Sequence, residues 1–167
     1  MTYAQALAFV LKWEGLFSDN KADPGGRTMK GITQKTYDSY LALNGQHSKD
    51  VKNISDNEVA DIYSVHYWHA AHCPQLPADL APCVFNCAVN SGVDRAIKLL
   101  QRTLGVKEDG QVGPVTLAAC KPGLAARYLD VHEQFYRSLV SNKPSLGVFL
   151  TGWINRLNSL RAALGVK

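Results

Sequence analysis

Two carboxylic side chains near the N-terminus have the types and the spacing that the hydrolysis of a glycosidic bond requires. Glu14 follows Trp13 at the end of an apolar stretch, and Asp23 lies nine residues later, directly before Pro24. Such hydrolysis commonly uses one carboxylic acid to protonate the leaving oxygen and a second carboxylate as base or nucleophile. Glu14 and Asp23 are therefore candidate catalytic residues, and the hydroxyl of Thr28 is a candidate to position a water molecule.

Each of these residues also has an alternative interpretation. Glu14 is predicted to end a helix that starts near Ala4, where the helix dipole and the Trp13 ring favour the protonated form that a general acid needs. It could equally be a solvated surface glutamate. Asp23 could brace the turn at Pro24, and Thr28 could stabilise the same loop.

The elements that would position these residues are mostly helices. Glycines are dense between Gly15 and Ile32, which predicts tight turns or a short hairpin. Capping boxes are predicted at Thr2 and at Ser55, each at the start of a helix. Apolar residues at helical spacing predict further helices at residues 34–43, 83–90, 95–104, from 114, 124–139 and 148–164. The fold class is therefore mainly α, with a small hairpin or loop region near the N-terminus.

Composition narrows the class of protein. The chain has 167 residues, 46% of them apolar, and a formal net charge of +4, all ordinary for a globular protein. No run of about 18 apolar residues is present, so we expect no membrane insertion, and we expect no signal peptide. The four cysteines are too few and too irregular for a disulfide framework. The mild positive charge favours binding to any polyanion, including nucleic acid, anionic lipid and an anionic cell wall, and therefore does not identify the partner.

Several segments, in the same order, resemble glycoside hydrolase family 108. They are Trp13 to Ser18, Ala22 to Gln34, Tyr63 with Tyr67 and Trp68, Ala88 to Gly92, Asp109 to Thr116, and Gly152 and Trp153 with Arg156. The last two resemble a C-terminal peptidoglycan-binding region. The family comprises phage endolysins and related bacterial muramidases.

The resemblance implies a lysozyme-like helical fold and a substrate, peptidoglycan, cut at the β-1,4 bond between N-acetylmuramic acid and N-acetylglucosamine. It places the catalytic glutamate of the family's Glu-Gly-Gly motif at Glu14, although Leu16 replaces the second glycine. The broader phage-lysozyme pattern points to Asp23 and, shifted by one position, to Thr28. No cofactor is expected.

A glycan groove is expected to have aromatic walls and polar tips. The candidate substrate-binding residues are Gln34, Tyr37, Tyr63, Tyr67, Trp68 and Asn90, although aromatic residues on helices more often belong to the core. His66, His69 and His72 beside Cys73 match no standard zinc pattern, so no metal is expected. Cys83 and Cys87 are expected to be buried free thiols.

Two questions of organisation and function remain open at this stage. We expect a muramidase region at 1–92 and a helical peptidoglycan-binding-like subdomain at 93–167, with one compact domain as the alternative. The alternatives to a muramidase are a lytic transglycosylase acting on the same bond and a non-catalytic peptidoglycan-binding protein. We expect a monomer that binds no nucleic acid and waits in the host bacterial cytoplasm. A holin would then release it to the periplasm and cell wall.

Overall fold

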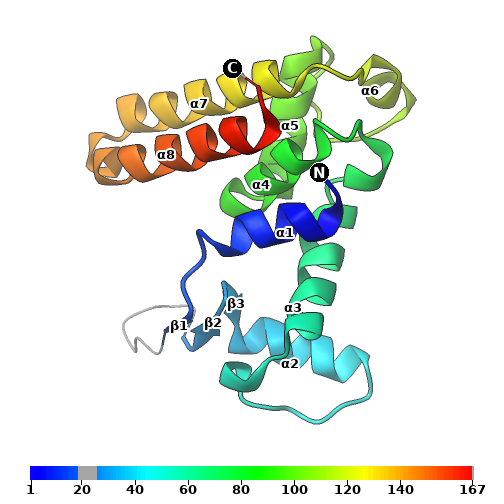
Figure 1. Cartoon of the computed structure of the whole chain (residues 1–167), viewed down its shortest axis with the longest axis vertical. Helices are drawn as coiled ribbons and strands as arrows, with labels where there is room; N and C mark the ends of the chain where they lie inside the picture. The colour runs from blue at the N-terminus through cyan, green and yellow to red at the C-terminus, as the bar shows by residue number, and fades with distance from the viewer. Residues whose placement is uncertain (19–25, 167) are drawn as a thin grey trace. The chain divides into compact units, whose positions relative to one another are not determined.

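The computed structural model describes residues 1–18 and 26–166, and it is mainly helical with a small sheet near the N-terminus (Figure 1). The chain divides into two compact units. We call Leu7–His66 the hairpin unit, and Met1–Ala6 together with Tyr67–Lys167 the helical unit. Each unit is described by itself.

Helix α1, Tyr3–Leu11, starts at the predicted capping box: the Thr2 N–H donates to Gln5 Oε1 at 2.9 Å, and the Gln5 N–H donates to Thr2 Oγ1 at 3.3 Å. The helix is shorter than predicted. After Leu11 the chain makes a tighter turn, in which the Trp13 N–H donates to the Val10 carbonyl at 2.9 Å. Glu14 therefore lies beyond the last turn of α1, outside the short range over which a helix dipole acts.

The predicted hairpin is a three-stranded antiparallel sheet in the order β1-β2-β3. Its strands are β1 (Phe17–Ser18), β2 (Thr28–Met29) and β3 (Ile32–Thr33). Met29 pairs with both Phe17 and Ile32, so β2 is the central strand. Lys30 and Gly31 form the two-residue turn between β2 and β3, with φ angles of 50° and 74°. Two successive positive φ angles are the pattern of a type I′ hairpin turn.

The helices of the hairpin unit are α2 (Gln34–Leu43) and α3 (Asp56–Tyr63), with a short 3₁₀ turn η1 (Val51–Asn53) between them. Ser55 and Glu58 form the predicted capping box of α3. The helical spacing of Val59, Ile62, Tyr63, His66 and Tyr67 predicts one continuous helix after Ser55. The chain instead continues from α3 as a π-helix, η2 (Ser64–His69). This change of period alters which side chains share a face.

The helical unit contains the 3₁₀ turn η3 (Cys73–Gln75), α4 (Ala81–Ser91), α5 (Val93–Leu104), α6 (Pro114–Ala119), α7 (Ala125–Asn142), the 3₁₀ turn η4 (Pro144–Leu146) and α8 (Gly147–Leu164). Helix α4 is buried at every position from Ala81 to Ala88, as its apolar sequence predicts, and it packs against α5. Helices α7 and α8 form an antiparallel hairpin (Figure 1).

The division into compact units does not fall at residue 92. It falls between His66 and Tyr67, within η2. The domain boundaries expected from sequence, 1–92 and 93–167, follow the motifs and remain a prediction. None of the helices in the described part of the chain has the length and apolarity needed to cross a bilayer.

Candidate active site

The Glu14 carboxyl lies against the turn between β2 and β3. A Cβ atom placed on Gly31 would be 3.0 Å from Glu14 Oε2 and 2.6 Å from the hydroxyl oxygen of Tyr63. The carboxyl and the phenol therefore meet on the same side of the Gly31 backbone. Glu14 is half-buried, so its surroundings include both protein and solvent. A half-buried carboxyl held against a glycine backbone can reach a bound substrate while keeping a fixed orientation.

Three different groups hold this turn in place. The Lys30 N–H donates to the Leu16 carbonyl at 2.9 Å, and the Lys30 carbonyl accepts a hydrogen bond from the Tyr63 hydroxyl at 2.9 Å. The Lys30 ammonium pairs with the Asp56 carboxylate at the start of α3. Sequence reasoning missed Lys30 and Gly31 as site residues. Their adjacency between two short strands was the available signal, since a two-residue hairpin turn needs positive φ angles.

The two other predicted catalytic residues differ in what the structure shows. Thr28 is half-buried in β2, where it pairs with Ser18 of β1 and Thr33 of β3. It therefore belongs to the same sheet as the turn that contacts Glu14. Asp23 lies outside the described residues. Its role as the second carboxylate remains a prediction.

Gln34 and Tyr37 of α2 have structural roles in the hairpin unit, and their predicted contact with sugar remains a prediction. The Gln34 amide donates to Asp38 Oδ1 at 2.9 Å and to the Lys49 carbonyl at 2.7 Å, and it accepts from the Val51 N–H at 2.8 Å. Tyr37 has no exposed surface, and its hydroxyl donates to Glu58 at 3.0 Å. Burial, together with the Glu58 carboxylate, raises the pKa of Tyr37 to about 12.

Tyr63 and Trp68 also lie in the core of their units. Tyr63 is 2% exposed and contacts the hairpin turn through its hydroxyl. Trp68, in the helical unit, is 9% exposed and packs against the rings of Tyr3 and Phe85, with centroids 5.2 and 5.4 Å away. Both residues are buried for the same reason, because amphipathic helices turn their aromatic residues inward. Their contact with a substrate remains a prediction.

Tyr67 and Asn90 retain accessible surface, as does the half-buried Gln34. Tyr67 is half-buried. Asn90 is exposed at the end of α4, and its Oδ1 accepts a hydrogen bond from the Tyr136 hydroxyl at 2.7 Å. That bond uses the oxygen of the amide, so the NH₂ group points away from Tyr136. Tyr67 and Asn90 belong to the helical unit.

The cysteines and histidines show no catalytic arrangement. Cys73, Cys83 and Cys87 are buried free thiols, as predicted for the last two. Burial raises the pKa of Cys73 and of Cys87 to about 12, far from the thiolate form that a nucleophile or a metal ligand needs. Among the described residues, no group of three or more histidine, cysteine or acidic side chains is arranged to hold a metal ion.

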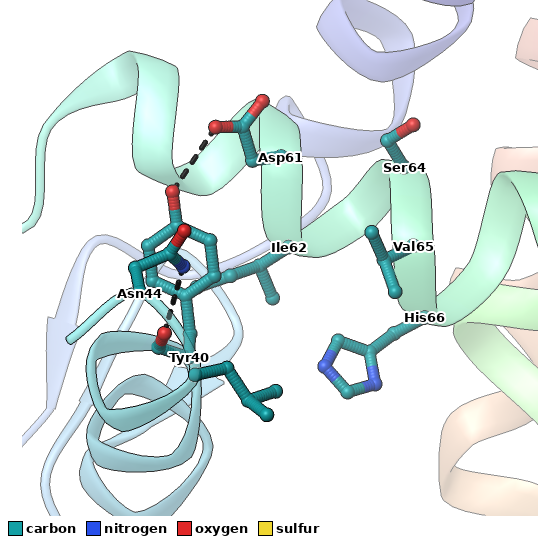
Figure 2. Close-up of a pocket in the computed structure, with 8 residues that line it drawn as sticks. Tyr40, Asn44, Asp61, Ile62, Ser64, Val65 and His66 are labelled. Carbon is teal, nitrogen blue, oxygen red and sulfur yellow. Dashed lines mark hydrogen bonds between the residues drawn. The ribbon is translucent and has the colours of Figure 1, made fainter.

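The hairpin unit also has a cavity of about 310 Å³ between the end of α2 and the α3–η2 segment, shown in Figure 2. Two of its polar residues pair with each other, since the Tyr40 hydroxyl donates to Asp61 at 3.0 Å. Leu43 and Val65, which line it, are 88% and 64% exposed. Glu14 is not among the residues that line this cavity.

Comparison with known proteins identifies the class to which this fold and site belong. Residues 7–92 match the family described as Glycosyl hydrolase 108, and residues 95–158 match the Predicted Peptidoglycan domain. The protein is a glycoside hydrolase that acts on peptidoglycan. Since the first match spans half of the sequence, the chain belongs to the glycosyl hydrolase 108 family.

A solved structure agrees with this assignment of the fold. The structure titled "Structure of Brucella abortus SagA" is similar over 97% of this chain and 92% of that chain, with a TM-score of 0.76 and 31% sequence identity. No curated protein matches. The predicted fold class, mainly helical and lysozyme-like with a small hairpin near the N-terminus, is confirmed.

Proposed function

We propose that the protein is a muramidase that hydrolyses the β-1,4 bond between N-acetylmuramic acid and N-acetylglucosamine, with Glu14 as the general acid. The observation that carries this proposal is the position of the Glu14 carboxyl, half-buried and fixed against the Gly31 backbone within the family-matched region. A general acid must be held in one orientation to deliver its proton to a specific oxygen.

In the proposed reaction, the Glu14 carboxyl gives its proton to the bridging oxygen as the bond from that oxygen to the sugar's anomeric carbon breaks. Water then adds its hydroxyl group to the oxocarbenium-like centre, and its remaining proton goes to the Asp23 carboxylate. If Asp23 instead stabilises the positive charge, that proton goes to the Glu14 carboxylate, which restores the acid. Thr28 assists from β2 by positioning the water. Gln34, Tyr67 and Asn90 are the candidates for substrate contact that have accessible surface.

The test is the conservative substitution Glu14→Gln, which keeps the side-chain volume and removes the acidic proton. We expect it to abolish the clearing of outer-membrane-permeabilised Gram-negative cells while the circular dichroism spectrum stays unchanged. Glu108→Gln is the matched control, since Glu108 is an exposed carboxylate that pairs with Arg102 at 2.7 Å in the helical unit. Wild-type clearing by Glu14→Gln would reject the assignment of the acid.

Two further measurements test the second carboxylate and the type of reaction. Asp23→Asn should cause a large loss of activity. Mass spectra of the released muropeptides separate hydrolysis from transglycosylation, because a hydrolase leaves reducing ends, whereas a transglycosylase leaves anhydro ends through attack by the sugar's own 6-hydroxyl. Reducing ends are expected.

We further propose that the protein acts as an endolysin. It would wait in the host cytoplasm until a holin permeabilises the inner membrane, and would then act as a monomer on the cell wall. Loss of cell lysis when the protein is expressed without a holin, and its return when one is supplied, is the expected result.

A further inference from the structure

The turn at Lys30 and Gly31 adopts a backbone conformation that its sequence alone does not favour. Lys30 has φ at 50°, and it is one of two non-glycine residues with a positive φ in the described part of the chain. A residue with a long side chain stays in this region only when the surrounding structure holds it there. The conformation therefore needs external contacts.

Those contacts come from two segments of the hairpin unit, the segment after Glu14 and helix α3. Leu16, two residues after Glu14, accepts the Lys30 N–H, which ties the turn to the segment that carries the acid. Tyr63 and Asp56, both on α3, bind the Lys30 carbonyl and ammonium. The N–H, the carbonyl and the ammonium group of Lys30 therefore all have partners. Two of these partners are on α3, so α3 holds the turn in its position.

The shape of the turn decides where the Glu14 carboxyl lies. Gly31 presents bare backbone to Glu14 Oε2, and the Tyr63 hydroxyl occupies the adjacent space. If the Lys30 carbonyl moved, Gly31 would move with it, because the two residues share a peptide plane. The surface that supports the carboxyl would then shift relative to the substrate.

We propose that Tyr63, acting through the Lys30–Gly31 turn, is a positioning residue for the Glu14 proton. This inference rests on the proposed function, in which Glu14 is the acid. Tyr63 is 2% exposed, so it acts on the orientation of the acid and not by contact with a sugar. A displacement of about 1 Å at a reacting group can cost up to a hundredfold in rate, which sets the scale of the effect.

The experiment compares two variants that each remove one tyrosine hydroxyl from the hairpin unit. Tyr63→Phe breaks the 2.9 Å bond to the Lys30 carbonyl, and the control Tyr40→Phe breaks the 3.0 Å bond to Asp61. On soluble glycan fragments we expect Tyr63→Phe to lower kcat by about tenfold to a hundredfold with KM within about twofold of the wild type. Tyr40→Phe should change neither, and both variants should unfold at similar temperatures.

Three results would decide the question. If kcat of Tyr63→Phe equals that of Tyr40→Phe while Glu14→Gln is inactive, the positioning role is overturned and the proposed function stands. If Glu14→Gln is active, the proposed function fails. If Tyr63→Phe does not fold, Gly31→Ala is the second variant. A loss of kcat at constant KM in the folded Gly31→Ala protein supports the proposal, and wild-type kcat overturns it.

Discussion

His132 illustrates how far a single side chain can depart from its ordinary chemistry in this protein. It lies on α7 with no exposed surface, and neither of its ring nitrogens has a hydrogen-bond partner in the described part of the chain. The centroid of its ring lies 4.4 Å from the centroid of the Tyr136 ring. Burial, and secondarily the charge of Arg156, lowers the pKa of His132 to about 3.

This lowered pKa predicts that the protein loses stability in acid. In the unfolded chain a histidine binds a proton near pH 6.5, whereas folded His132 binds one only near pH 3. Between these values the unfolded state holds more protons, so the free energy of unfolding falls as pH falls, by at most about 1.4 kcal/mol per pH unit from this group. Urea unfolding at pH 7, 5.5 and 4 measures that slope.

The matched variants are His132→Phe, which keeps an aromatic ring in the core, and His47→Gln, which changes an exposed histidine. We expect His132→Phe to flatten the loss of stability between pH 7 and 4, and His47→Gln to leave it as in the wild type. A slope that is the same in all three proteins would show that His132 does not control acid stability.

Among the elements, the β2–β3 turn connects local backbone geometry to the position of the acid. We predict that Gly31→Ala lowers the rate of cell clearing by at least about tenfold. Alanine is strained at φ of 74°, and its Cβ would collide with the Tyr63 hydroxyl and crowd the Glu14 carboxyl. The control is Gly15→Ala, because a Cβ on Gly15 meets no atom of residues 1–18 or 26–166 within 4 Å.

A double variant separates the collision from the strain. In a Tyr63→Phe background, the hydroxyl that would lie 2.6 Å from the new Cβ is absent, so the further loss caused by Gly31→Ala should be smaller than in the wild type. Strictly additive losses would mean that the collision of the new Cβ with the Tyr63 hydroxyl does not contribute to the loss of activity.

The elements themselves were largely predictable from sequence, because their signals are local. Residues 34–43 form a helix as predicted, and both capping boxes are present. The arrangement of the candidate site was less predictable. Tyrosines on a helix, such as Tyr37 and Tyr63, are typical both of the wall of a groove and of a core. The packing of α2 and α3, which the sequence does not show, places both hydroxyls in internal hydrogen bonds. The contact of Glu14 with Gly31, 17 residues later, depends on the pairing of β1 with β2, which brings the β2–β3 turn back to the acid.

At the scale of the whole molecule, we expect the net charge to favour a general attraction to an anionic cell wall. The formal net charge is +4, and many of the basic side chains are already paired with acidic ones on the surface. Lys121 and Lys143 are exposed and form no ion pair within the described part of the chain. Such cations contribute to long-range attraction, which salt screens over a distance of about 10 Å at 0.1 M.

We therefore predict that binding to purified peptidoglycan sacculi weakens as salt rises, and that Lys121 and Lys143 account for part of this dependence. The measurement is co-sedimentation of the Glu14→Gln protein, which should bind without cutting, between about 20 and 300 mM NaCl. Replacing both lysines by glutamine should make the salt dependence shallower, whereas replacing both by arginine should preserve it because the charge is retained. Equal salt dependence in the glutamine and arginine variants would show that the attraction comes from a localised binding site and not from these exposed charges.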